Sequence, residues 1–214
     1  QFIPAAERSG LIVEIGTEVL LRGCTELEPW LSADPTRSLA VNVSGVQLQQ
    51  GNFPELLFAT AGSCGVDPHQ LVVEVTESVF FDDDCRVQRQ LVQLRSAGVR
   101  VALDDFGTGY SSLGRLQDLP VDTLKIDRSF VAMIHGGTEH LPILDCMIDM
   151  AHGLGLTVTA EGVETREQAE YLIRRGCDSL QGFLFSRPQP ASGLPAALTS
   201  SARTITKLRH DTAA

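Results

Sequence analysis

Six short apolar segments alternate with segments of helical periodicity along the chain, and this alternation limits the possible folds more than any other feature. The apolar segments are rich in branched residues and predict strands at residues 38–44, 71–76, 100–104, 123–127, 156–160 and 179–181. The helical spacing predicts helices at residues 11–31, 53–61, 82–97, 111–118, 141–154 and 165–175. Glycines follow three of these segments, as is typical of helix ends, namely Gly62 with Gly65, Gly98 and Gly176. Strands that alternate with helices predict an α/β fold with a parallel sheet.

Polar residues stand at or just after the carboxyl end of each predicted strand. They are Asn42, Glu74, Asp104 with Asp105, Lys125 with Asp127, Glu161 and Gln181. Two closures of the sheet are compatible with the alternation, a doubly wound open sheet and a (β/α) barrel. In an open sheet these residues would be spread along one edge, whereas in a barrel the strand ends meet at one mouth. We therefore expect a barrel with its active site at that mouth.

The residues expected at the mouth provide oxygen ligands rather than sulfur or imidazole. Because no His or Cys stands at a strand end, the set disfavours zinc and copper and favours Mg²⁺ or Mn²⁺. Asp104 and Asp105 are adjacent and can divide between two ions, and two ions can clamp the oxygens of a phosphoryl transfer. Lys125 would add a positive charge for a phosphate oxygen or for the attacking water. Phosphate esters are therefore the expected substrate class.

Composition excludes several other classes of protein. The chain has 214 residues and a formal net charge of −10, which disfavours binding to the backbone of a nucleic-acid duplex. Its longest apolar runs are far below the ~20 residues of a membrane helix. The five cysteines are scattered and form no C-x-x-C pair, so a disulfide framework and a zinc ribbon are disfavoured and a cytoplasmic location is expected.

Several motifs resemble those of the EAL family of cyclic di-GMP phosphodiesterases. The longest is Asp104-Asp-Phe-Gly-Thr-Gly-Tyr-Ser-Ser-Leu113. Others are Asn42-Val-Ser44, Glu74-Val-Thr-Glu77, Lys125-Ile-Asp127, Ala160-Glu-Gly-Val-Glu164 and Gln181-Gly182. The resemblance runs from residue 2 to about Pro190, with the motifs in the family's order. It implies a modified TIM-type barrel and a bacterial signalling hydrolase that converts cyclic di-GMP to the linear dinucleotide with two Mg²⁺ or Mn²⁺ ions, Ca²⁺ being inhibitory.

The resemblance also implies a role for each site residue. The metal ligands would be Asn42, Glu74, Asp104, Asp105 and Glu161, with Asp104 shared between the two ions. The catalytic residues would be Lys125, Glu161, Asp105 and Gln181, with Lys125 positioning the hydrolytic water. The substrate-binding residues would be Asp127, Glu164, Gln181 and Pro188. Glu77 would anchor the loop at residues 105–112 and so couple metal binding to dimer contacts.

One motif of the family is absent from the sequence. The Glu-Ala-Leu motif of its first strand, which precedes an arginine that contacts the substrate phosphate, would lie just upstream of Phe2. We therefore expect residues 1–190 to form an EAL domain without its first strand and residues 191–214 to form a helical or flexible tail. On this basis the chain alone should hydrolyse cyclic di-GMP weakly or not at all, whereas the intact parent should be active.

Two functional classes remain open at this point. The first is an active phosphodiesterase, and the second is a non-catalytic cyclic di-GMP receptor or protein-interaction domain on the same scaffold. The resemblance further implies a homodimer and allows an upstream GGDEF or sensory domain in a parent that is cytoplasmic or tethered to a membrane.

Overall fold

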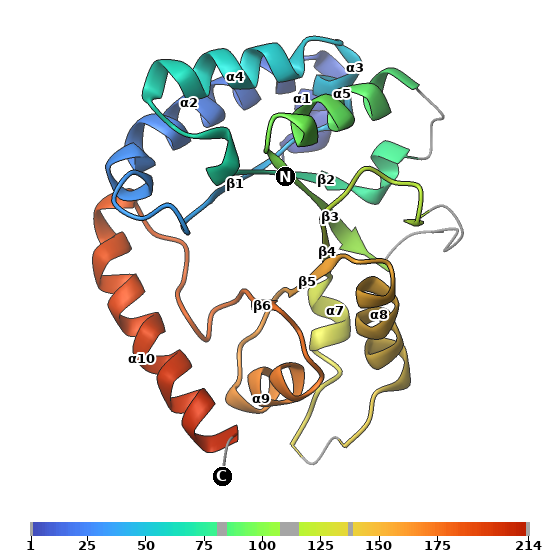
Figure 1. Ribbon diagram of the computed structural model, residues 1–214, viewed down its shortest axis with the longest axis vertical. Coiled ribbons are helices and arrows are strands. Elements are labelled where there is room, and N and C mark those ends of the chain that lie inside the picture. Colours follow the sequence, from blue (N-terminus) through green and yellow to red (C-terminus); the bar gives the residue numbers. More distant parts are fainter. Residues whose placement is uncertain (1, 81–84, 108–115, 137–138, 213–214) are drawn as a thin grey trace. The chain divides into compact units, whose positions relative to one another are not determined.

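A computed structural model describes residues 2–80, 85–107, 116–136 and 139–212. The chain divides into two compact units. Unit 1 comprises residues 1–104 and 109–122, and unit 2 comprises residues 105–108 and 123–214. The two units are described separately below, and Figure 1 labels their helices and strands.

Unit 1 contains three parallel strands that pair in chain order. They are β1 (Leu39–Asn42), β2 (Leu71–Thr76) and β3 (Arg100–Phe106), and the last two residues of β3 belong to unit 2. The α-helices are α1 (Ile3–Ser9), α2 (Ile12–Leu31), α3 (Gly45–Gln49), α4 (Phe53–Cys64) and α5 (Cys85–Ser96). Two 3₁₀ turns flank β2, namely η1 (Pro68–Gln70) and η2 (Glu77–Phe80). In Figure 1, α2 and α4 run side by side, and α2 also packs on β1.

Unit 2 repeats this arrangement with three more parallel strands. They are β4 (Thr123–Ile126), β5 (Thr157–Ala160) and β6 (Ser179–Leu180), again paired in chain order. The helices are α7 (Arg128–Val131), α8 (Pro142–Gly153), α9 (Arg166–Arg174), the 3₁₀ turn η3 (Ala191–Gly193) and α10 (Leu194–Thr212). Helix α8 packs on β5, and α9 packs against α10.

The strands form where branched apolar residues fill the interior of each unit. In β2, Leu71, Val73 and Val75 are each 1% exposed, while the alternate residues are partly accessible. This alternation is that of a strand with one face in the core. In unit 2, Leu124 and Val158 are fully buried, and burial of side chains of this size stabilises the fold by about 1.5–3 kcal/mol each.

All six predicted strands are present, but some helix boundaries differ from the predictions. Helix α4 continues through Gly62 to Cys64 and ends at Gly65, whose φ of 76° is reached without strain by glycine at a helix end. The predicted end at Ala61 was therefore three residues too early, and Gly65, the second of the two glycines predicted to end this helix, is the one that does so. The predicted helix at residues 111–118 and the start of the one at residues 82–97 lie largely outside the described residues.

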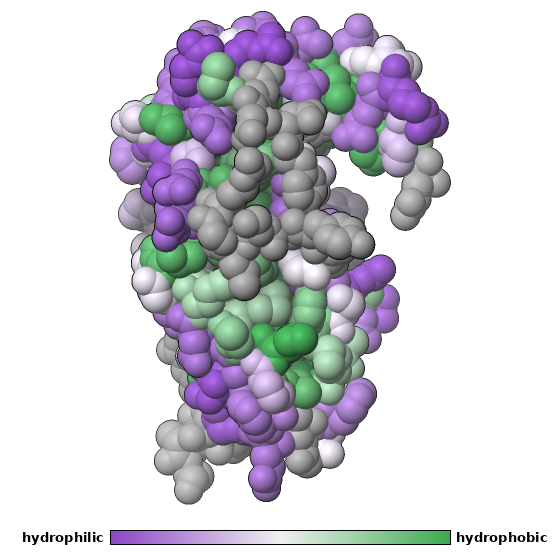
Figure 2. All heavy atoms as spheres, turned by 90° about the vertical axis from the view of Figure 1, so that its right-hand side faces the viewer, coloured by the Kyte–Doolittle hydropathy of each residue, from purple (hydrophilic) through white to green (hydrophobic). Residues whose placement is uncertain are grey.

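Figure 2 shows one face on which purple, hydrophilic residues predominate and green, hydrophobic residues gather in a smaller area. No described helix combines the length and the apolar character that a membrane crossing would require.

Candidate functional site

The carboxyl ends of the strands in unit 1 bring three predicted metal ligands to one face of the sheet. Asn42 is the register partner of Glu74, and Glu74 is the partner of Ala102 on β3. Asp104 lies two residues beyond Ala102 and therefore on the same face. Asp104 is 9% exposed, Glu74 is partly buried and Asn42 is exposed. Strand register therefore places the amide and the two carboxylates as neighbours, as oxygen ligands of one cation would be.

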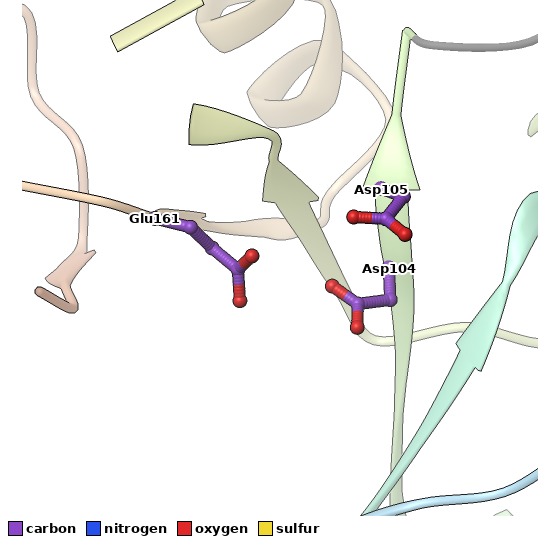
Figure 3. Close-up of side chains that lie close together, drawn as sticks. All are labelled: Asp104, Asp105 and Glu161. Carbon is purple, nitrogen blue, oxygen red and sulfur yellow. The ribbon is translucent and has the colours of Figure 1, made fainter. Parts of the chain in front are cut away.

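Asp104 and Asp105 point to the same side of β3 although they are consecutive. Successive side chains of a regular strand point to opposite faces. Asp105, however, has a φ of 55°, and among the described residues it is the one non-glycine residue with a positive φ. Figure 3 shows the carboxylates of both aspartates turned toward Glu161. The left-handed backbone at Asp105 thus brings two adjacent carboxylates together at the end of the strand.

Glu161, just after β5, completes a cluster of three carboxylates. Asp105 and Glu161 belong to unit 2, and Asp104 is joined to Asp105 by the peptide bond at the unit boundary. Each of the three residues offers one oxygen, and these oxygens lie within 4.8 Å of one another. The backbone N–H of Glu161 donates to the carbonyl oxygen of Ile126 at 3.1 Å, which fixes the chain where it leaves β5.

Lys125 brings a positive charge to the carboxylate cluster. Its Nζ lies 2.6 Å from Oε1 of Glu161, and its side chain is 4% exposed while that of Glu161 is 20% exposed. Because β4 and β5 are in register with Lys125 opposite Thr159, the lysine reaches Glu161 from the neighbouring strand. A buried ammonium is costly without an anionic partner, and Glu161 provides one.

The donor set of the cluster fits a divalent cation of the Mg²⁺ or Mn²⁺ type. Three carboxylates within 4.8 Å repel one another, and a divalent cation among them would relieve this repulsion. Their oxygens are the ligands that Mg²⁺ and Mn²⁺ prefer. Exposed acidic groups also cluster without metal, but here Asp104 is buried and Asp105 has a backbone conformation that few residues adopt.

Asp127 has a structural task that the sequence analysis did not predict. Its Oδ1 accepts hydrogen bonds from the backbone N–H of Ser129 at 2.9 Å and from Oγ of Ser129, and so caps the N-terminus of α7. Burial raises the pKa of Asp127, but the hydrogen bonds from Ser129 and the nearby Arg128 outweigh burial and lower the pKa overall. Asp127 is therefore ionised at neutral pH and engaged at the start of a helix.

The predicted substrate-binding residues lie on the accessible surface of unit 2. Gln181 is exposed at the end of β6, where its backbone N–H donates to the carbonyl of Ala160 at 2.8 Å. Glu164 is exposed in the segment after β5. Gln181 and Pro188 line a groove of about 430 Å³ whose other wall is made by α10. The groove therefore begins at Gln181, the residue that follows β6.

Glu77, the predicted loop anchor, is buried in η2 at 8% exposure. Neither of its carboxylate oxygens has a hydrogen-bond partner among the described residues. A buried carboxylate without a partner is costly, so this residue requires an explanation beyond packing. Most of the loop that it would anchor, from residue 108 on, lies outside the described residues.

One contact near the site was missed by the sequence analysis. Oγ of Ser44 donates to Oε1 of Glu7 at 2.7 Å and accepts from the backbone N–H of Val46. Ser44 also forms a capping box with Gln47 at the start of α3. The S-x-x-Q spacing was readable as a helix start, but the link to α1 was not. This contact fixes the chain two residues beyond Asn42.

The comparisons with known proteins agree with the geometry. The model of the EAL domain family matches residues 1–188. The chain is 40% identical over 199 residues to the bifunctional diguanylate cyclase/cyclic di-GMP phosphodiesterase MucR of Pseudomonas aeruginosa, covering 92% of this chain and 29% of that protein. The chain spans about a quarter to a third of the length of the curated relatives it matches.

Solved structures show the same fold. The PaMucR phosphodiesterase in complex with c-di-GMP matches with a TM-score of 0.83 and 40% identity, over 91% of this chain and 79% of that one. The manganese/cy-diGMP complex of Klebsiella pneumoniae BlrP1 matches with a TM-score of 0.73 and 32% identity, over 82% of this chain and 45% of that one. The predicted α/β fold of the EAL type is therefore confirmed.

Proposed function

Because the chain belongs to the EAL domain family, we propose that it hydrolyses one phosphodiester bond of cyclic di-GMP to give the linear dinucleotide. The observation that carries this proposal is the cluster of Asp104, Asp105 and Glu161, whose carboxylates lie within 4.8 Å of one another. The ion pair of Lys125 with Glu161 adds a buried cation next to it. The relatives support the substrate, since PaMucR is solved with c-di-GMP.

Two sets of residues would hold divalent cations under this proposal. Asn42, Glu74 and Asp104 would hold the first, and Asp104, Asp105 and Glu161 the second. When bound, Mg²⁺ or Mn²⁺ supplies Lewis acidity and lowers the pKa of a coordinated water. The manganese complex of BlrP1 supports a divalent cation in this family, and Ca²⁺, with its longer bonds and larger ligand number, should inhibit.

The remaining residues have roles that follow from their positions. Lys125, held by Glu161, would donate a hydrogen bond to the hydrolytic water or to a phosphate oxygen. Gln181, exposed at the end of β6, would contact the water or the substrate, and Glu164 and Pro188 would lie along the bound dinucleotide. Asp127 would contribute to substrate binding while its side chain also caps the N-terminus of α7. The homodimer, the cytoplasmic location and an additional signalling domain in the parent stay predictions.

The test is single-turnover hydrolysis with the protein in excess over cyclic di-GMP, so that even slow conversion is detected. Formation of the linear dinucleotide with Mn²⁺ or Mg²⁺, and its loss with a chelator, is the expected result. Binding of cyclic di-GMP without conversion, also in a chain extended upstream by the family's first strand, would assign the domain to the receptor class instead. If titration shows neither bound cyclic di-GMP nor bound Mn²⁺, the proposal is overturned.

A further inference from the structure

Two cysteines of unit 1 lie on neighbouring helices that pack against each other. Cys24 is on α2 and is fully buried, and Cys64 is the last residue of α4 and is partly exposed. The two helices run side by side in Figure 1. Neither residue belongs to a metal-binding or catalytic set, and both are reduced.

One contact places the thiol of Cys64 beside the residue that follows Cys24 on α2. Sγ of Cys64 lies 3.5 Å from Oγ1 of Thr25, the residue that follows Cys24. On the other side of Cys24, a Cβ added to Gly23 would lie 3.3 Å from Cδ2 of Leu39, so α2 packs closely on β1 at this turn. Burial raises the pKa of the Cys24 thiol to about 11, and the neighbouring Cys64 adds to this rise.

We propose that Cys24 and Cys64 form an oxidation-dependent disulfide that joins α2 to α4, with a peroxide as the oxidant. The thiolate of the accessible Cys64 attacks the peroxide oxygen and becomes a sulfenic acid, releasing hydroxide. The sulfur of Cys24 then attacks the Cys64 sulfur, and the hydroxyl leaves as water together with the thiol proton. In sum, two thiols and one hydrogen peroxide give one disulfide and two waters.

The difference in exposure sets the order of these steps. Cys64 meets the oxidant because it is partly exposed, whereas Cys24, at 0% exposure, does not. Burial raises the pKa of the Cys24 thiol to about 11, so little of its thiolate is present at neutral pH, and we expect oxidation over minutes to hours rather than seconds.

The disulfide would close a loop of the chain that contains the end of α2, β1, α3 and the whole of α4. A cross-link over this many residues restricts the unfolded chain, and native disulfides of this kind raise the stability appreciably. We expect the thermal midpoint of the oxidised chain to exceed that of the reduced chain by roughly 5–10 °C. Because β1 ends at Asn42, the cross-link would also fix the helices behind one strand of the proposed site.

The experiment treats the freshly reduced chain with hydrogen peroxide and follows its intact mass. The expected product has lost two hydrogens, about 2 Da, and peptide mapping without reductant yields one peptide pair joined through Cys24 and Cys64. A reductant should restore both the original mass and the original thermal midpoint. Cross-linked peptides that join other cysteines, or oxidation of Cys64 to a sulfinic acid without any cross-link, would overturn the proposal.

Three variants separate the pair from the other thiols. Cys64→Ser, at a partly exposed helix end, should fold normally and lose both the cross-link and the rise in thermal midpoint. Cys24→Ala should do the same and leave Cys64 as a stable sulfenic acid that a dimedone probe labels. Cys146→Ser, at an exposed position of α8, should retain both effects. This test does not depend on cyclic di-GMP, so its outcome is independent of the proposed function.

Discussion

Nζ of Lys125 lies 2.6 Å from Oε1 of Glu161, and both side chains stand at the carboxyl ends of paired strands. The pair joins a buried ammonium to one of the three clustered carboxylates. The carboxylate of Glu161 therefore lies next to the ammonium of Lys125 and also next to the position of a proposed cation. This relationship makes the stability of unit 2 and the chemistry of the site interdependent.

The interdependence predicts non-additive effects on stability. Glu161→Gln should lower the free energy of unfolding because it removes the negative charge that lies 2.6 Å from the buried ammonium of Lys125. Lys125→Met should be less damaging, and the double variant should cost less than the sum, with a coupling of about 1–3 kcal/mol. Urea unfolding in the presence of a chelator measures the free energy of unfolding of the parent, the two single variants and the double variant. Strictly additive changes would contradict a structural role of the pair.

Asp104→Asn should weaken metal binding and hydrolysis together. The substitution keeps the shape of the side chain but removes the charge of the carboxylate that both proposed cations share. We expect the affinity for Mn²⁺ to fall by about tenfold or more and turnover to fall by several powers of ten. Mn²⁺ titration and single-turnover hydrolysis measure the two effects. Asp149→Asn, at a side chain that is 74% exposed on α8, is the matched control and should change neither.

Glu77→Gln separates an anchoring role from plain burial. If Glu77 holds the loop at residues 105–112, the Mn²⁺ concentration for half-maximal hydrolysis should rise in the variant while the KM for cyclic di-GMP changes little. If the carboxylate is merely buried, its neutral replacement should raise the free energy of unfolding and leave the metal dependence unchanged. Glu55→Gln on the exposed face of α4 controls for loss of charge in the same unit.

Tyr171→Phe should give a loss of stability that depends on pH. Burial raises the pKa of Asp145, but the hydrogen bond from Tyr171 at 2.6 Å, the charge of Arg175 and the hydrogen bond from His140 lower it overall. A carboxyl whose pKa is lowered by folding stabilises the fold above its unfolded pKa, near 4, and this contribution is lost as the pH falls through the folded pKa.

The variant should therefore lose about 1.5–3 kcal/mol at pH 7, since a buried hydrogen bond to a charged group is removed. Its deficit relative to the parent should shrink as the pH falls through the folded pKa of Asp145, which lies below its ordinary value in the parent. Urea unfolding at pH 7 and at a series of acidic pH values measures this difference. A deficit that stays equal over the whole series would show that Tyr171 acts through packing rather than through the charge of Asp145.

The sequence predicted the strands well because their signal is local. Segments such as residues 71–76 and 100–104 combine branched apolar residues with a polar residue at the carboxyl end, and each became a strand. The short helices α1, α3 and α7 were missed, since they have too few turns for a periodic pattern. Helices α3 and α7 each begin at a capping side chain, that of Ser44 and that of Asp127. A single capping residue is a weaker signal in the sequence than a periodic pattern over several turns.

The candidate site was predictable in its residues and not in its geometry. Strand ends brought Asn42, Glu74 and Asp104 to one face because register in a parallel sheet follows from the strand positions. The left-handed backbone of Asp105 and the second task of Asp127 could not be read from residue types, because they depend on how the chain turns after each strand. The anchoring role of Glu77 was implied by the resemblance and by nothing in its local sequence, and it stays a prediction.

The positive φ of Asp105 also restricts which amino acids this position tolerates. Glycine, asparagine and aspartate accept a left-handed backbone most readily, and of these three only aspartate carries a carboxylate. Backbone conformation and charge therefore both restrict this position, and aspartate is the residue type that satisfies both. Asparagine would accept the left-handed backbone but lacks the charge, whereas glutamate carries the charge but accepts this backbone less readily.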